Sequence, residues 1–302
     1  MRVYSSWRIV LTLMTSLLAS SRSALAHDGP EAVIAALNAK MLKSGPTADL
    51  MFRRASEFRA LRDDVRAAND LQRAIELDGS LEIARLELAR LQLKLQRQAA
   101  DSPQPLLVLG EPMETLQPLL ESPSEIVRIA ALALRGEIHL AYCQWNDAAA
   151  DFSAALKSRP EEVQWALWQA EALQRLGRYS ECLTALRESY VTTGSPVIRA
   201  RLCDVLIENA SKDLSGELLP AVFIDEAGAI IERELADSRL KSAWRIRRAQ
   251  LLLLTESQNP EHREEARREL NAALEELNNR LSTNSPDPKL VRDRQRALAM
   301  LK

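Results

Sequence analysis

Apolar residues recur every three to four positions through most of the chain after Pro30, with charged residues between them. This spacing places the apolar side chains on one face of an α-helix. Turn residues interrupt the pattern at Lys43–Thr47, Leu77–Ser80, Ser158–Glu161, Thr192–Pro196 and Thr283–Pro288. The segments between these turns suit helices of about 12 to 18 residues. The chain is therefore predicted to be all-α and built from helical hairpins.

Small residues recur at a fixed spacing in the middle of these helices. They are Ala55, Ala89, Gly136, Ala170, the small-sized Asp204, and Ala249. Three neighbouring pairs are 34 residues apart, while the steps from Ala89 and from Asp204 to the next member are 47 and 45 residues. The chain is thus an array of repeats, with insertions near residues 99–111 and 211–220.

A second signature follows 12 residues after the first in three of the repeats. It is a small residue, a bulky residue and another small residue, spaced by four and then three positions, as in Ala148, Phe152 and Ala155. The same spacing recurs at residues 67, 71 and 74, at 182, 186 and 189, and at 266, 270 and 273. These spacings keep the three side chains on one helix face. Small side chains let two helices approach closely, and hairpins that cannot bury their own apolar faces stack.

These features resemble the tetratricopeptide repeat (TPR) family, whose unit is a 34-residue helix–turn–helix. Residues 136–160 match its small, bulky and small positions and its closing proline, and Gly177 and Tyr179 match its turn. The resemblance covers about residues 47–281, or about six units, and implies an α-solenoid of stacked hairpins with a right-handed superhelix. Asp204 and Glu234 depart from it by placing charges where small apolar residues are expected, and Pro118 is expected to kink or end a helix.

The segments that flank the array have predicted roles of their own. Residues 27–46 and 282–302 each contain a helix that we expect to cap an end of the array, because a terminal repeat otherwise exposes an apolar face. Residues 1–26 read as a secretory signal peptide, with a short apolar run at Ile9–Ser20 and the small-residue pattern Ala24–Ala26 before the cleavage site. An uncleaved membrane anchor is the alternative. The protein is therefore expected to be exported, either to a periplasm or out of the cell, with no membrane span after cleavage.

The TPR resemblance implies a partner groove on the concave side, lined by the first helix of each hairpin. The family's clamp of Lys, Asn and Arg side chains is absent, because the matching positions hold residues such as Phe52 and Ser56, or Leu86 and Arg90. The groove candidates are Phe52, Ser56, Arg59, Arg90, Lys94, Glu137, Gln164, Glu171, Gln174, Arg175, Arg201, Glu208 and Asn209. Basic residues lie toward the N-terminal units, so an acidic or extended polypeptide segment is the expected partner. The apolar run Leu106–Leu109 in the first insertion is a rival contact surface.

Composition narrows the functional classes. Cleavage of the signal removes three arginines, so the net charge falls from −2 to about −5, which disfavours nucleic acid as a partner. The adjacent carboxylate pairs point in different directions on a helix, and there is no Ser–His–Asp arrangement or Gly-rich phosphate loop. We expect a non-catalytic scaffold without a cofactor. The four tryptophans after the signal are expected to serve mainly as core residues.

A metal-handling or enzyme-associated accessory protein is the alternative function. It rests on His139 and Cys143, which lie one helical turn apart, and on His27, which would become the mature N-terminus. A metal site needs three or four ligands, and His262 lies far away in the repeat. We therefore expect His139 to be a packing residue. The thiols of Cys143, Cys182 and Cys203 are expected to be small buried side chains, although an exported protein could join two of them in a disulfide.

Overall fold

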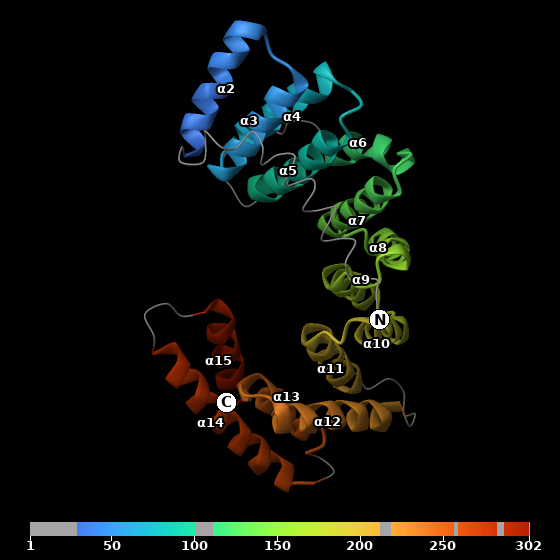
Figure 1. Ribbon diagram of the computed structural model, residues 1–302. Helices are drawn as coiled ribbons and strands as arrows, with labels where there is room; N and C mark the ends of the chain where they lie inside the picture. The colour runs from blue at the N-terminus through green and yellow to red at the C-terminus, as the bar shows by residue number, and fades with distance from the viewer. Residues whose placement is uncertain (1–28, 101–110, 212–218, 257–258, 283–286, 302) are drawn as a thin grey trace, which may run out of the picture. The chain divides into compact units, whose positions relative to one another are not determined.

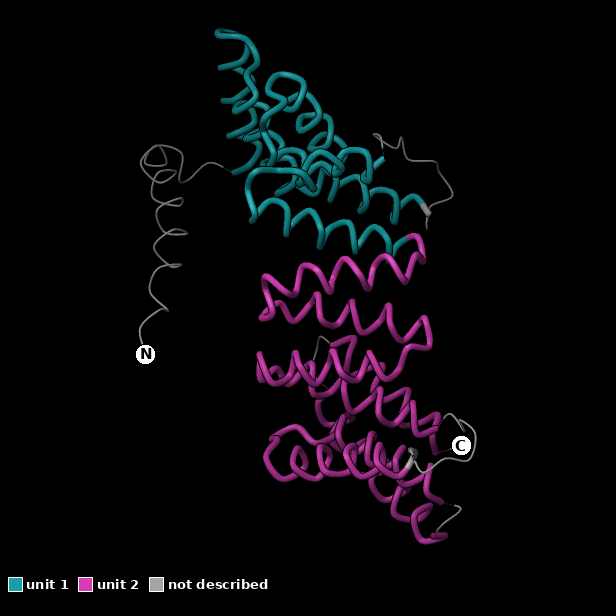
Figure 2. Tube along the Cα trace, turned by 90° about the vertical axis from the view of Figure 1, so that its right-hand side faces the viewer, with its two compact units in different colours: residues 1–141 teal, residues 142–302 magenta. Residues whose placement is uncertain are grey.

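In the computed structural model, residues 29–100, 111–211, 219–256, 259–282 and 287–301 are described. Within these ranges the chain forms fourteen α-helices and one 3-10 helix, and no strand (Figure 1). It divides into two compact units, residues 1–141 and 142–302 (Figure 2). The fold is thus an all-α solenoid of hairpins, and within each unit most helices pack against their neighbours in sequence.

The first unit begins with α2 and ends with α7. Its elements are α2 (Pro30–Ser44), α3 (Ala48–Ala60), α4 (Asp64–Leu77), α5 (Glu82–Ala100), α6 (Pro112–Leu116), the 3-10 helix η1 (Gln117–Glu121) and α7 (Glu125–Ala141). Pro118 lies in η1, just beyond the end of α6, as its missing N–H predicts.

The second unit contains eight helices in its described part. They are α8 (Trp145–Ser158), α9 (Val163–Arg175), α10 (Tyr179–Thr193), α11 (Pro196–Ser211), α12 (Leu219–Asp237), α13 (Ser242–Leu254), α14 (Glu261–Leu281) and α15 (Pro288–Met300). Helix α9 contacts α11, α11 contacts α13, and α13 contacts α15. We call these four the inner helices of unit 2, because they pack directly on one another.

The small positions of the repeat are buried, as the spacing predicts. Ala148, Ala155 and Ala170 have no exposed surface. Phe152, which lies between Ala148 and Ala155 on α8, is also fully buried. Cys182 takes the place of an alanine on α10, and its Sγ donates to the carbonyl oxygen of Ala170 on α9 at 3.4 Å. The two helices therefore approach closely where both side chains are small.

The turns repeat with the same register. Gly177 between α9 and α10 has φ +72°, in the left-handed region that favours glycine. Cys143, 34 residues earlier, has φ +57°, and Arg62, between α3 and α4, has φ +59°. The same left-handed conformation therefore recurs in the turn after α3, α7 and α9, even where the residue carries a β-carbon.

The two charged residues in small positions are held by ion pairs. Asp204 on α11 accepts two hydrogen bonds from Arg247 on α13, at 2.9 and 2.8 Å. Glu234 is buried on α12 and pairs with Arg199 on α11 at 2.6 Å. Because a buried charge without a partner is strongly destabilising, these departures from the repeat depend on their arginines.

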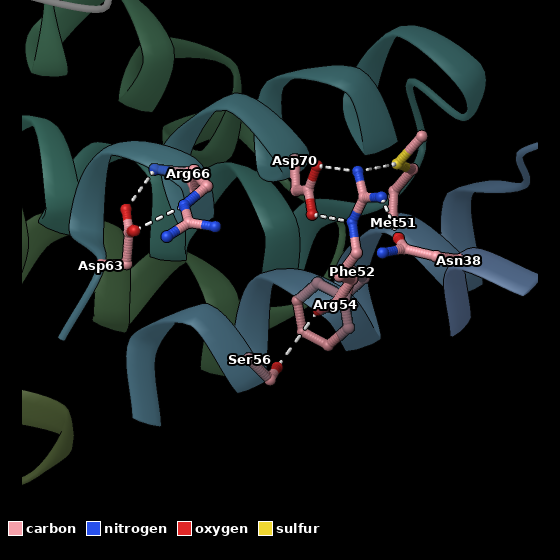
Figure 3. A network of polar contacts seen from close by, with 8 residues as sticks. All are labelled: Asn38, Met51, Phe52, Arg54, Ser56, Asp63, Arg66 and Asp70. Carbon is pink, nitrogen blue, oxygen red and sulfur yellow. Dashed lines mark hydrogen bonds and ion pairs between the residues drawn. The ribbon is translucent and has the colours of Figure 1, made fainter. Parts of the chain in front are cut away.

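The helix before the array is tied to it by a polar network (Figure 3). Arg54 on α3 donates to both carboxylate oxygens of the buried Asp70 on α4 at 2.6 Å, and to Asn38 Oδ1 on α2 at 2.6 Å. The pKa of Arg54 is raised by its hydrogen bond to Asp70. The exposed residues of α2 are mixed, because Lys40 and Lys43 lie beside Ala32, Ala35, Ala36, Ala39 and Leu42. Helix α2 thus packs against α3.

Several sequence-based expectations fall outside the described residues. The predicted signal peptide, residues 1–26, lies within residues 1–28. The run Leu106–Leu109 lies in residues 101–110, and most of the predicted second insertion lies in residues 212–218. In the part of the chain that is described, none of the helices combines the length and the apolar character that a bilayer crossing requires.

The close contact between α9 and α10 leads to a stability prediction. Replacing Ala170 by Leu places extra methyl groups in a fully packed contact, and overpacking of this kind costs about 1–3 kcal/mol. The same replacement at Ala154, which is exposed on α8, should change the free energy of unfolding by no more than about 0.5 kcal/mol. Urea denaturation followed by circular dichroism measures both. Equal shifts for the two variants would show that Ala170 does not mark a helix contact.

Candidate functional site

The basic groove candidates of unit 1 are all paired with acids. Arg59 on α3 and Arg90 on α5 share the carboxylate of Glu87, with Arg90 at 2.8 Å. Lys94 on α5 pairs with Asp64 at the start of α4, at 2.5 Å. All three basic side chains remain about half exposed, so this surface is polar but close to charge-balanced.

The other candidates of unit 1 are less available to a partner. Phe52 is half-buried and packs against the core formed by α3, α4 and α5, while Ser56 donates to the Phe52 carbonyl oxygen at 3.2 Å (Figure 3). Glu137 on α7 is half-buried, and its burial raises the pKa of its carboxyl above the ordinary value of 4.5. The nearby charges of Arg97 and Arg90 offset part of this effect. Phe52 is thus a packing residue as much as a surface one.

In unit 2 the structure brings three of the candidates together. The side-chain amide of Gln174 on α9 donates to the Glu208 carboxylate on α11, and its oxygen accepts from Arg201, also on α11. Gln174 and Glu208 are 34 residues apart, so the repeat places them side by side. This polar bridge joins two inner helices at the surface.

The remaining candidates of unit 2 differ in their surroundings. Gln164 is exposed near the start of α9, Glu171 is half-buried, and Arg175 lies over the ring of Trp145 at 5.6 Å. Asn209 is the exception, because only 7% of it is exposed and its Oδ1 has no hydrogen-bond partner among the described residues. Asn209 thus offers a partner little surface, and its role in the groove stays a prediction.

A pocket of about 550 Å³ lies next to this bridge, between α11, α13 and α15. Ile207, Leu253, Leu254 and Met300 supply its apolar lining. Its polar lining consists of Arg201, Asp204, Glu208, Ser211, Gln250 and Arg296. We call this the inner pocket. It combines an apolar floor with charges of both signs.

The polar groups around the inner pocket hold one another in place. Arg296 on α15 donates to Gln250 Oε1 on α13 at 2.7 Å and lies 3.9 Å from Asp204. Asp204 is in turn fixed by Arg247. Because these side chains are already oriented, a ligand would not have to order them on binding.

Sequence reasoning missed more than half of the inner pocket. Gln250 follows Ala249 as Arg90 follows Ala89, so the repeat register carries the signal for Gln250 and, one turn on, for Leu254. Arg296 and Met300 carry no such signal, because α15 lies beyond the last repeat. Its role in the pocket depends on its packing against α13 and α14.

The geometry gives little support to a metal site at His139 and Cys143. His139 is half-buried on α7, and Cys143 is exposed in the turn after it, which corrects the expectation that Cys143 is buried. Among the described residues no three His, Cys, Asp or Glu side chains are grouped as metal ligands. Cys182 and Cys203 are buried free thiols, and burial raises their pKa values to about 11 and about 12, so they are poor nucleophiles and ligands. His27 lies outside the described residues.

Comparison with known proteins identifies the class of fold. No protein-family model and no curated protein matches the chain. Among solved structures, a tetratricopeptide repeat protein from Parabacteroides merdae matches with a TM-score of 0.52 and 15% identity, over 94% of this chain and 98% of that one. A thermophilic TPR protein from Thermus thermophilus matches with a TM-score of 0.39 and 19% identity, over 68% of this chain and 99% of that one. Yeast Tom70 matches with a TM-score of 0.43 and 14% identity, over 89% of this chain and 58% of that one.

The likeness to the Parabacteroides protein shows that this chain has a TPR-like fold. At 15% identity the likeness concerns the fold alone and does not extend to the function.

The raised pKa of Glu137 generates a prediction about pH. A carboxyl whose folded pKa is raised favours the folded state while it is protonated, and this advantage is lost as the pH rises from 4.5 through the folded pKa. Replacing Glu137 by Gln removes the titration. The melting temperature of Glu137→Gln relative to the wild type should therefore increase as the pH rises from about 4 to 7. Scanning fluorimetry across this range measures it, with the exposed Glu125 on the same helix changed to Gln as the control. A constant difference across the range would contradict it.

Proposed function

We propose that this protein is an exported, non-catalytic scaffold that binds a polypeptide segment of a partner protein on the inner helices of unit 2. The observation that carries the proposal is the inner pocket, in which three consecutive inner helices converge on one apolar floor with a charged rim. Two of the groove candidates predicted from sequence, Arg201 and Glu208, line this pocket, and Gln174 holds both of them.

The chemistry of the inner pocket favours a particular kind of segment. Leu253, Leu254 and Met300 are partly exposed, so an apolar side chain of the partner that covers them is removed from water at about 25 cal/mol per Å². The rim carries Arg201 and Arg296 beside Asp204 and Glu208, so it has no strong net charge. A segment with one or two apolar anchors and mixed polar neighbours fits this arrangement better than a strongly acidic one.

Export and the absence of catalysis are parts of the proposal that rest on the sequence. The support for export is the apolar run and the Ala24–Ala26 pattern in residues 1–26. N-terminal sequencing of the native protein should find His27 as the first residue in the exported fraction. Recovery of the protein from a membrane pellet with Met1 retained would contradict export without affecting the proposed binding site.

Binding at the inner pocket is tested with peptides. A phage library of random linear seven-residue peptides is panned on the purified protein, and selected peptides are synthesised and titrated by fluorescence anisotropy. Arg296→Glu makes the rim acidic beside Asp204, and we expect it to weaken a group of the selected peptides at least tenfold, or about 1.4 kcal/mol.

Arg292→Glu is the matched control, because it makes the same charge change on the exposed surface of α15 and does not line the pocket. Its effect on affinity should stay within about threefold, since a charge outside the pocket acts on the peptide only through screened long-range attraction. If both variants lose the same affinity, or if neither does, the inner pocket is not the binding site.

A further inference from the structure

A second hollow runs along the opposite helices of unit 2. Two pockets, of about 570 and 270 Å³, share the lining residues Ser153, Gln169, Ala185 and Glu188, so they form one continuous depression. Its walls are α8 and α10, and its floor is formed by α9. We call it the outer furrow. It shares no residue with the inner pocket.

The outer furrow exists because the side chains on its walls are small. Ala149, Ala150 and Ser153 line it from α8, and Ser180, Thr184 and Ala185 line it from α10. These side chains are too short to fill the space between α8 and α10. Helices of 14 and 15 residues give a furrow about 21 Å long, which an extended peptide of about six residues would span.

One polar group in the furrow is left without a partner. Ser189 lines the smaller pocket, only 8% of it is exposed, and its hydroxyl has no hydrogen-bond partner among the described residues. The other hydroxyls nearby on α10 are satisfied, because Thr184, Thr192 and Thr193 each donate to the carbonyl oxygen four residues earlier. A buried hydroxyl without a partner is costly, and a turn about χ1 would present it to a ligand in the furrow.

The charged residues that line the furrow are two of each sign, which disfavours a strongly charged ligand. At one end Arg178 makes two hydrogen bonds to Glu181, at 2.6 and 2.5 Å, and a third to Asn146 at 3.2 Å. Lys157 lies at the other end, and Glu188, which lines both pockets, lies between the two ends. Between these ends lie Gln169 and Ser189, whose side chains can both donate and accept hydrogen bonds.

We propose that the outer furrow is a second binding site, and that it takes an extended, uncharged polypeptide segment with small side chains from a partner protein. The peptide backbone supplies alternating N–H and C=O groups that can satisfy Gln169 and Ser189. Because the side chains on both walls are small, a backbone that carries small side chains can lie between them. The chain would then hold two segments at once, one on each side of the hairpins of unit 2.

The test fills the furrow and measures peptide binding. Ala150 is exposed and lines the furrow, whereas Ala154 is exposed one turn further along α8 and lines neither pocket. Among the seven-residue peptides selected by panning, we expect a group that Ala150→Leu weakens at least tenfold. Ala154→Leu and Arg296→Glu should leave this group unchanged. Thr184→Leu, on the opposite wall, is the second blocking variant if Ala150→Leu alters the melting temperature.

Ser189→Ala separates a binding role from a structural one. Removal of an unsatisfied buried hydroxyl should raise the melting temperature of the free protein by about 2 °C, while the affinity of the same peptides falls. A higher melting temperature with unchanged affinity would show that the hydroxyl does not meet a ligand and would overturn the proposal.

Two further outcomes would also overturn the outer furrow as a peptide site. One is that every selected peptide depends on Arg296 and none on Ala150, which would leave the inner pocket as the only peptide site found. The other is that Ala150→Leu changes the molar mass measured by light scattering, which would mean that a second copy of this chain occupies the furrow.

Discussion

The structure depends on close approach of helix backbones at small side chains that recur along the chain. Where Ala170 meets Cys182, the thiol reaches the backbone carbonyl of the facing helix, and a larger residue at either position would separate the two helices. The same constraint explains the turns, since Arg62, Cys143 and Gly177 all adopt left-handed backbone conformations that bring the second helix back onto the first. Helix packing and turn geometry therefore enforce one register.

This register determines which surfaces can bind a partner. In unit 2 the inner helices pack directly on one another, so residues 34 positions apart, such as Gln174 and Glu208, meet at the surface. The inner pocket forms where this row of contacts continues onto α15. On the other side, small residues on α8 and α10 leave the outer furrow. The same packing thus leaves an amphipathic pocket at α11, α13 and α15 and a furrow of balanced charge at α8, α9 and α10.

The fold was largely predictable because helix packing depends on the size and spacing of side chains, which the sequence states directly. The details of the site were less predictable. Asn209 is polar but lies inside, and Phe52 belongs partly to the core, because the side of a helix that faces its neighbours depends on how consecutive hairpins are rotated. Asp204 places a charge where the repeat has a small apolar residue, yet Arg247 from another helix pairs with that charge. Such a partner, 43 residues away, has no local signature.

The most direct test of this account is chemical cross-linking between two inner helices. In a Cys143→Ser background, in which the two remaining native thiols are buried, Gln174→Cys and Glu208→Cys are introduced together and treated with a short bismaleimide. Because the two native side chains are in contact, mass spectrometry should find positions 174 and 208 joined within one chain. The pair Gln164→Cys and Glu208→Cys should not be joined by the reagent, since Gln164 lies about 15 Å further along α9. Joining of 164 to 208, with none of 174 to 208, would contradict the register from which the inner pocket is built.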